Sequence, residues 1–88
     1  MSVKLGESNF QKIISETSQL VLVDFYSDSC IPCKRLSPLL AELEETYPDQ
    51  LLVGKVNVLF EAKLVEEYEV ISAPTVFLIK NGEIKEKI

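Results

Sequence analysis

The sequence predicts an α/β domain with a mixed central sheet that carries helices on both faces. Three observations support this prediction. The chain has 88 residues, which suits one domain spanning residues 1–88. Segments with strand character alternate with segments of helical periodicity in the order β-α-β-α-β-α-β-β. An Asn-Gly pair joins the last two strands and predicts a two-residue hairpin, so these strands must be antiparallel.

The first half of the chain is predicted to contain two strands and two helices. Residues 2–5 are a short strand candidate, and Ser8 fits the start of a capping box for the helix that follows. Residues 20–26 form a nearly continuous apolar run, which is typical of a central strand covered on both faces. A long helix is predicted from Cys33 onwards, with Glu44 off its apolar face. The predicted inner face consists of Leu36, Leu39, Leu40, Leu43 and Tyr47.

The second half completes the alternation. Residues 51–58 are predicted to form a strand and residues 59–68 a short helix. Residues 75–80 and 83–88 are the two strands of the predicted hairpin. In this arrangement the two cysteines fall just past the end of the central strand, at the start of the long helix. Open α/β sheets commonly place their functional sites at such a position.

The composition narrows the classes of partner. Nine basic and fourteen acidic side chains give a net charge of −5, which disfavours binding to nucleic acid or to an anionic membrane. No apolar run reaches the ~18 residues that a membrane-spanning helix requires. The first ten residues lack the apolar core of a signal peptide. We therefore expect a cytoplasmic protein, in a compartment where structural disulfides are rare.

Cys30 and Cys33 are the only cysteines of the chain, and the sequence contains no histidine. Three interpretations of the pair remain open from the residues alone. A structural disulfide that closes so small a loop would add little stability. A structural metal site needs four ligands, so it would require carboxylates or a second chain, as in a metal-bridged dimer. A reversible dithiol–disulfide needs only two sulfurs within bonding reach, one of them activated as a thiolate.

The predicted helix start favours the third interpretation. Cys30 would lie at or just before the first turn, where unpaired N–H groups and the helix dipole stabilise an anion. Such a position lowers the pKa of a thiol, so we expect Cys30 to attack and the more buried Cys33 to resolve. Pro32 suits the first turn, because its missing N–H would have no helical partner there.

Three further residues have two interpretations each. Asp24, within the apolar central strand, either faces a loop or is a carboxyl buried behind Cys33. Burial would raise the pKa of Asp24 and allow it to take the proton of Cys33. Lys55, in the next strand, either extends to solvent or tunes Asp24. Pro74 precedes a strand, and spacing alone leaves open whether its peptide bond is cis or trans.

Several segments in combination resemble the thioredoxin family. They are VDFYSDSCIPCKRLSPLL, GKVNV and APTVFLIKNGE, and the match runs from about residue 3 to residue 84. The resemblance implies the thioredoxin fold and a protein-disulfide reductase that works through a reversible dithiol–disulfide, with no bound cofactor and no metal. It also implies two kinds of partner, protein disulfide substrates and an NADPH-dependent thioredoxin reductase.

The resemblance assigns four catalytic residues. Cys30 matches the exposed nucleophile of the family and Cys33 matches its buried resolving thiol. Asp24 matches the buried acid/base, and Lys55 matches the neighbour of that acid.

The resemblance also assigns the expected substrate contacts. Pro74 matches the cis-proline that lies against the disulfide and keeps metal out. Ala73 matches the backbone that pairs with an extended substrate segment, a form of strand addition. Ile31 and Pro32, between the two cysteines, complete the expected contacts.

The sequence departs from the family at four places, one of which is Ile31, where the motif of the family has glycine. Ser29 stands where the family has tryptophan, and the smaller side chain would leave the disulfide more open. Leu59 stands where an acidic residue is common in the family. The sequence ends at Ile88, within the last strand, so we expect a thioredoxin fold without the C-terminal helix. A dimer through the face left uncovered is one expectation. The alternative function is a docking module of this fold with little redox turnover.

Overall fold

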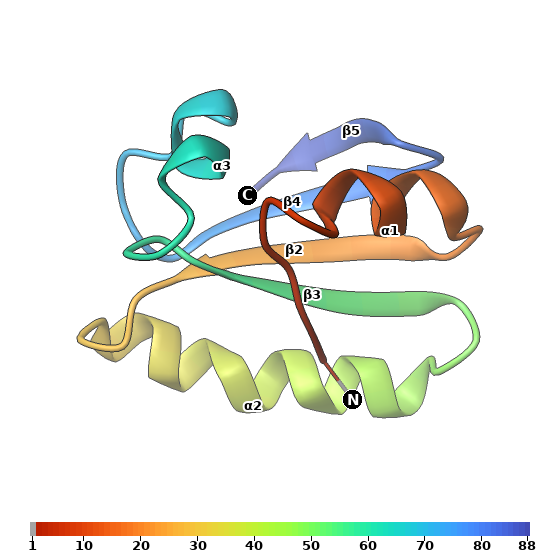
Figure 1. The fold of residues 1–88 in the computed structure, drawn as a ribbon. Helices are drawn as coiled ribbons and strands as arrows, with labels where there is room; N and C mark the ends of the chain where they lie inside the picture. Colours follow the sequence, from red (N-terminus) through yellow and green to blue (C-terminus); the bar gives the residue numbers. More distant parts are fainter. Residues whose placement is uncertain (1) are drawn as a thin grey trace.

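The computed structural model describes residues 2–88 as a five-stranded mixed sheet with helices on both faces (Figure 1). In chain order the elements are β1 (Val3–Lys4), α1 (Phe10–Glu16), β2 (Leu20–Tyr26), α2 (Ile31–Thr46), β3 (Leu51–Asn57), α3 (Ala62–Glu67), β4 (Thr75–Lys80) and β5 (Glu83–Lys87). The predicted order of strands and helices is therefore confirmed. No helix in this part of the chain combines the length and apolar character of a membrane-spanning segment.

Strand β2 lies at the centre of the sheet, whose strand order is β1-β3-β2-β4-β5. It pairs in parallel with β3 on one side and antiparallel with β4 on the other. The antiparallel hairpin of β4 and β5 is confirmed. Its turn residues Asn81 and Gly82 have φ angles of 53° and 80°, and Asn-Gly is the pair that tolerates two positive φ angles best.

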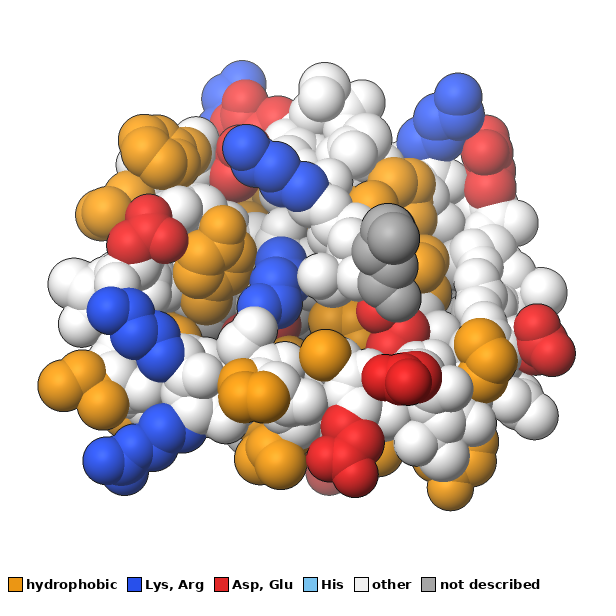
Figure 2. Space-filling model, turned by 90° about the horizontal axis from the view of Figure 1, so that it is seen from below, with side chains coloured by type: hydrophobic (Ala, Val, Ile, Leu, Met, Phe, Trp, Pro, Cys, Tyr) orange, Lys and Arg blue, Asp and Glu red, His pale blue; other side chains and the backbone are white. Residues whose placement is uncertain are grey.

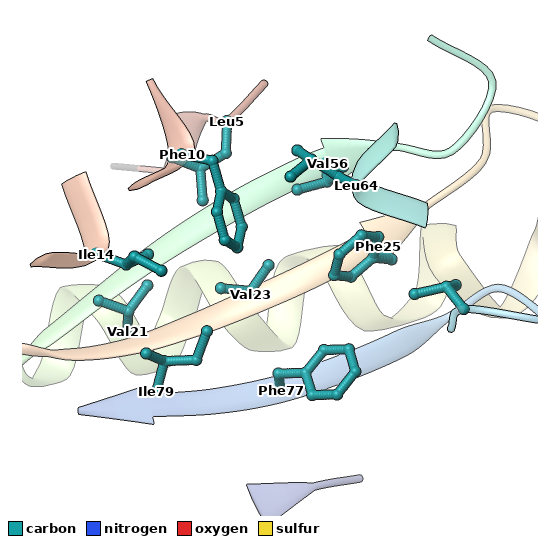
Figure 3. Close-up of a cluster of buried hydrophobic side chains, with 11 residues drawn as sticks. Leu5, Phe10, Ile14, Val21, Val23, Phe25, Val56, Leu64, Phe77 and Ile79 are labelled. Carbon is teal, nitrogen blue, oxygen red and sulfur yellow. The ribbon is translucent and has the colours of Figure 1, made fainter. Parts of the chain in front are cut away.

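The two faces of β2 carry different cores because successive strand residues point to opposite sides. Val21, Val23 and Phe25 point to the side of α1 and α3, where the larger cluster lies (Figure 3). Leu22 points to the side of α2 and packs in the smaller cluster with Leu40, from that helix. The predicted central strand, covered on both faces, is confirmed.

Two helix boundaries differ from the prediction. Asn9, not Ser8, precedes the first residue of α1, and its Oδ1 accepts a hydrogen bond from the N–H of Gly6 at 2.7 Å. The predicted capping box is therefore wrong. Helix α3 begins only at Ala62, because the N–H of Leu59 donates to the side chain of Asn57 in a turn that precedes the helix.

The inner face of α2 is also narrower than predicted. Leu39 and Leu43 are 57% and 42% exposed, whereas Cys33, Leu40 and Glu44 are buried. At about 100° per residue, Leu39 and Leu43 point roughly 120° and 80° away from the direction of Cys33. A helix packed on a sheet buries only one stripe of its side chains. The apolar periodicity of this segment therefore predicted more contact with the core than α2 makes. Figure 2 views this side and shows orange hydrophobic side chains at the surface among charged ones.

Glu44 is buried although the sequence predicted it off the apolar face. Its Oε2 accepts a hydrogen bond of 3.0 Å from the backbone N–H of Val53 in β3. Strand β1 pairs with β3 only at Gly54 and Lys55, so Val53 lies beyond the reach of that short strand. The carboxylate of Glu44 thus satisfies a buried backbone donor, which would otherwise cost free energy.

Leu5 of the N-terminal segment packs directly against Gly54 of β3. A methyl group added at Gly54 would overlap the Leu5 side chain, which is itself 1% exposed. The absence of a side chain at this position therefore lets Leu5 fill the core beside β3.

We predict that Gly54→Ala lowers the free energy of unfolding by about 1–3 kcal/mol, because an extra methyl group in a packed core forces strain. Chemical denaturation measures this loss. In a Leu5→Ala background, which opens the space, the added methyl group should cost less than it does in the parent chain. Equal costs in the two backgrounds would contradict the assigned contact.

Candidate functional site

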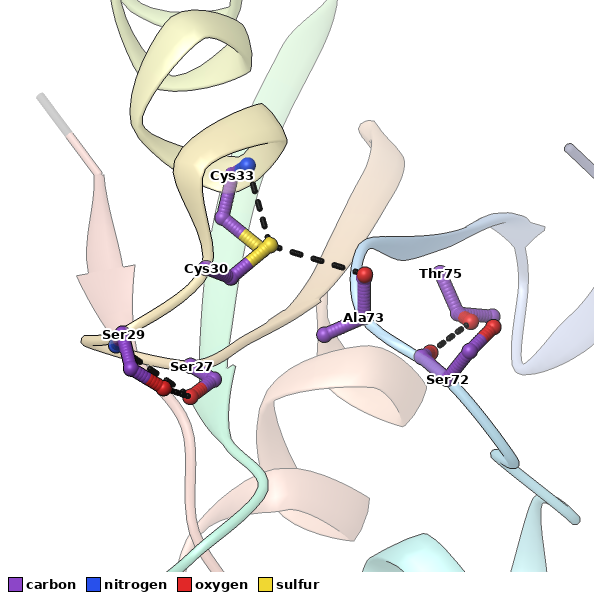
Figure 4. The surroundings of a disulfide bond; sticks show 7 residues. All are labelled: Ser27, Ser29, Cys30, Cys33, Ser72, Ala73 and Thr75. Carbon is purple, nitrogen blue, oxygen red and sulfur yellow. Dashed lines mark hydrogen bonds between the residues drawn. A yellow bond between two sulfur atoms is a disulfide. The ribbon is translucent and has the colours of Figure 1, made fainter.

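The two cysteines lie at the start of α2. Cys30 is the N-cap residue, Ile31 begins the helix and Pro32 lies within its first two positions. The sulfurs of Cys30 and Cys33 form a disulfide (Figure 4). The backbone N–H of Cys33 donates to the Cys30 sulfur at 3.1 Å. An N–H of the first turn and the positive end of the helix thus point at Cys30, which is an arrangement that stabilises a thiolate.

The two sulfur-bearing residues differ in access. Cys33 is 5% exposed, whereas Cys30 is only partly buried. Ile31, between them, is 63% exposed and presents an apolar side chain beside the disulfide. An incoming group therefore meets Cys30 and Ile31 before it can reach Cys33.

The segment before β4 lies next to the disulfide (Figure 4). The peptide bond between Ala73 and Pro74 is cis. The carbonyl oxygen of Ala73 lies 3.5 Å from the sulfur of Cys30. The hydroxyl of Thr75 donates to the carbonyl oxygen of Ser72 at 2.6 Å and closes this segment on itself. The fold thus brings Ala73 and Pro74 to the cysteines from 43 residues away in the sequence.

Asp24 is fully buried, at 0% exposure. Asp24 follows Leu22 by two residues in β2, so its side chain points to the same face of the sheet, the side of α2. Its register partners are Lys55 in β3 and Val76 in β4. Among the described residues, neither carboxyl oxygen has a hydrogen-bond partner. Burial raises the pKa of Asp24 above its ordinary value, and the charge of Lys55 partly opposes that rise.

Lys55 does not form an ion pair with Asp24. Its ammonium donates instead to the hydroxyl of Ser37 on α2, at 2.5 Å. The ammonium also lies 5.6 Å from the centre of the Tyr26 ring, within the range of a cation–π contact. Lys55 is partly buried and lines the cavity beside Cys33.

A cavity of about 180 Å³ connects the buried sulfur with the polar groups below it. Its lining residues are Tyr26, Ser27, Asp28, Cys33, Lys34, Ser37 and Lys55. The volume accommodates several water molecules, and the lining offers them hydroxyl, ammonium and carboxylate groups. The cavity is therefore large and polar enough to admit water beside Cys33.

The loop before the first cysteine is held by polar contacts that the sequence analysis missed. The amide of Asn57 donates to the carboxylate of Asp28 at 3.3 Å and ties the end of β3 to this loop. The hydroxyls of Ser27 and Ser29 lie 3.1 Å apart. Ser37 was also missed, although its position four residues after Cys33 is a signal for the same helix face.

Within residues 2–88, no three cysteine, aspartate or glutamate side chains come together as metal ligands would. The disulfide of Cys30 and Cys33 offers the exchange of the bond between two neighbouring sulfurs. One sulfur is accessible at a helix start and the other is shielded behind it.

Comparisons with known proteins agree with this geometry. A sequence model of the thioredoxin family matches residues 1–88. The chain is 36% identical over 86 residues to a thioredoxin of Rickettsia felis and covers 82% of that protein. It is 33% identical over 82 residues to a thioredoxin of Buchnera aphidicola and covers 76% of it. In these alignments, 98% and 93% of this chain are covered.

A solved structure leads to the same conclusion. The thioredoxin of Plasmodium falciparum superposes with a TM-score of 0.90 at 32% sequence identity. The alignment covers 98% of this chain and 83% of the other. The chain is a thiol-disulfide oxidoreductase that uses its own Cys30–Cys33 disulfide, and it belongs to the thioredoxin family.

Proposed function

We propose that this domain, residues 1–88, reduces disulfides of other proteins, with Cys30 as the nucleophile and Cys33 as the resolving thiol. The observation that carries the proposal is the Cys30 sulfur at the N-cap of α2, where it accepts the N–H of Cys33. This donor and the helix dipole stabilise Cys30 as a thiolate once the disulfide is reduced.

The reaction has two exchange steps. The Cys30 thiolate attacks one sulfur of the substrate disulfide, and the other substrate sulfur leaves as a thiolate. Cys33 then loses its proton, and its thiolate attacks the Cys30 sulfur of the mixed disulfide. The second substrate sulfur leaves, and the Cys30–Cys33 disulfide forms. Two electrons pass to the substrate, and a partner reductase must return two electrons before the next turnover.

Asp24 is proposed to accept the proton of Cys33 in the second step. Its burial supports this role, because a carboxyl with a raised pKa is a stronger base when it is ionised. Cys33 and Lys55 line the same cavity, and Asp24 is the register partner of Lys55, which places the thiol and the carboxyl on the same side of the sheet. Lys55 moderates the pKa of Asp24 through its charge.

The substrate is proposed to lie across the segment before β4. The carbonyl of Ala73, 3.5 Å from the Cys30 sulfur, suits backbone pairing with an extended peptide whose cysteine faces Cys30. Pro74 holds this segment against the disulfide. Ile31 and Pro32 provide an apolar contact on the other side, and the high exposure of Ile31 supports this assignment.

Three further assignments remain predictions. The partner reductase is expected to be an NADPH-dependent thioredoxin reductase, and the compartment is expected to be the cytoplasm. A dimer is also expected. Leu78, on the α2 side of β4, is partly exposed, which supports a contact there. Sedimentation at high protein concentration tests the dimer, and a monomer throughout would remove it.

We predict that Cys30→Ser abolishes the reduction of insulin by dithiothreitol above background, because no sulfur remains to attack the substrate. Cys33→Ser should still attack but should accumulate a mixed disulfide, since the resolving thiol is missing. Mass spectrometry of the trapped adduct measures this difference. Ser15→Ala, on α1 and far from the site in sequence, serves as the control and should retain full turnover. Equal trapping by both cysteine variants would contradict the assigned order of attack.

We predict that Asp24→Asn slows the release of substrate from the mixed disulfide about tenfold or more at neutral pH, because an amide cannot accept the proton of Cys33. Stopped-flow measurement of the second step, separated from the first by single-turnover conditions, checks this. The rate of the first attack should change little. An unchanged second step would remove Asp24 from the mechanism.

We predict that Asp24→Asn also stabilises the fold at alkaline pH. The pKa of Asp24 is raised in the folded state from an ordinary value of 3.8. The folded protein therefore binds this proton more tightly than the unfolded chain, and stability is lost as pH rises from about 4 through the folded pKa. The variant should exceed the parent in stability at pH 8 by more than it does at pH 4. Asp49→Asn makes the same substitution at an exposed position and serves as the matched control.

A further inference from the structure

The ammonium of Lys55 has two candidate acceptors near the buried cysteine, the hydroxyl of Ser37 and the carboxyl of Asp24. Lys55 and Asp24 are register partners on neighbouring strands, and both side chains point to the side of α2. The oxygens of Asp24 have no hydrogen-bond partner among the described residues, yet Lys55 donates to the hydroxyl of Ser37. The choice of a neutral hydroxyl over an adjacent carboxyl is the observation that requires an explanation.

We propose that Ser37 is a positioning residue for the exchange reaction, whose hydroxyl engages the Lys55 ammonium and thereby keeps it from forming an ion pair with Asp24. The proposal extends the proposed function, since it rests on Asp24 as the proton acceptor. The ammonium carries three N–H donors, yet it lies where it contacts the hydroxyl of Ser37 and reaches neither oxygen of Asp24. A hydrogen bond to Ser37 therefore weakens the pairing that an ionised Asp24 would otherwise gain in this buried site.

This competition has a direct consequence for the reaction. If Lys55 paired fully with Asp24, the ionised carboxylate would be stabilised and would become a weak base. With Lys55 held by Ser37, ionised Asp24 lacks that partner and accepts a proton more strongly. Ser37 thus preserves the basicity that the resolving step requires.

The surrounding groups leave Lys55 as the cation whose placement decides this balance. The titratable side chains that line the cavity are Tyr26, Asp28, Cys33, Lys34 and Lys55. On the other strand beside Asp24, β4 presents Val76, which has no charge. The carboxylate of Asp28 accepts a hydrogen bond from the amide of Asn57, and Lys34 is exposed on α2. Lys55 is the residue whose charge lowers the pKa of Asp24.

The position of Ser37 links this balance to the reactive sulfur. Ser37 follows Cys33 by four residues in α2, so both lie on the same helix face, one turn apart. The hydrogen bond between Ser37 and Lys55 also joins α2 to β3 immediately below the disulfide. The same helix turn therefore carries the thiol that loses the proton and the hydroxyl that controls the base.

The test is the variant Ser37→Ala, in which Lys55 loses the competing acceptor. Alanine favours helix formation, so α2 is expected to remain folded. Carboxyl-selective NMR titration of the reduced protein should show Asp24 ionising at lower pH than in the parent. At pH values below the midpoint, the ionised fraction should rise about two- to tenfold, the equivalent of one ordinary hydrogen bond. The acidic limb of the pH–rate profile for the resolving step should move in the same direction.

Three controls separate this effect from a general disturbance. Ser37→Thr keeps a hydroxyl and should restore the parent titration. Ser15→Ala removes a helix serine whose hydroxyl bonds only within α1, so it should leave Asp24 unchanged. In a Lys55→Met background, Ser37→Ala should no longer shift Asp24, because the effect passes through the ammonium.

The outcomes are distinct. An Asp24 titration that is unchanged or moves to higher pH in Ser37→Ala would overturn the proposal, as would an equal shift in the Lys55→Met background. The titration is read without turnover, so it stands apart from the proposed function. If Asp24→Asn left the resolving step unaffected, the role of Asp24 would fail while the competition for Lys55 could still be observed.

Discussion

The structure depends on the placement of strand β2, which is paired along both edges and covered on both faces. This strand cannot move without breaking two ladders and two cores. Its C-terminal end therefore delivers the cysteine loop to a fixed position, and the start of α2 follows from that position. The same constraint buries Asp24, because alternate residues of this central strand, Leu22 and Asp24 among them, point to the face that α2 covers.

A carboxyl at such a position is costly for the fold and useful for the chemistry. Burial without a hydrogen-bond partner penalises the ionised form, so the group holds its proton to higher pH than an exposed aspartate does. An apolar residue would pack at this position without that cost. The fold accepts a local electrostatic penalty at the place where a proton acceptor is needed, and strained or unsatisfied groups concentrate at functional sites for this reason.

The site also shows how access can separate two chemically identical groups. Cys30 and Cys33 differ by three residues, yet one caps the helix and the other lies under its first turn. The carbonyl of Ala73 approaches the outer sulfur, whereas the cavity with Lys55 and Ser37 borders the inner one. The two cysteines therefore have different surroundings, with the backbone of Ala73 beside Cys30 and a polar cavity beside Cys33.

The sequence by itself determined the order of the elements, the central strand, the hairpin and the cysteine pair at a helix start. These features depend on local periodicity and turn chemistry, which the chain carries within a few residues. The tertiary structure alone decided which stripe of α2 is buried, because the sheet contacts only the side of the helix that carries Cys33, Leu40 and Glu44. Leu39 and Leu43 were therefore assigned to the core wrongly, and Glu44 was assigned to the surface wrongly. The partner of Lys55 was likewise decided by tertiary contact, since Ser37 and Asp24 become alternatives only when α2 packs across β2 and β3.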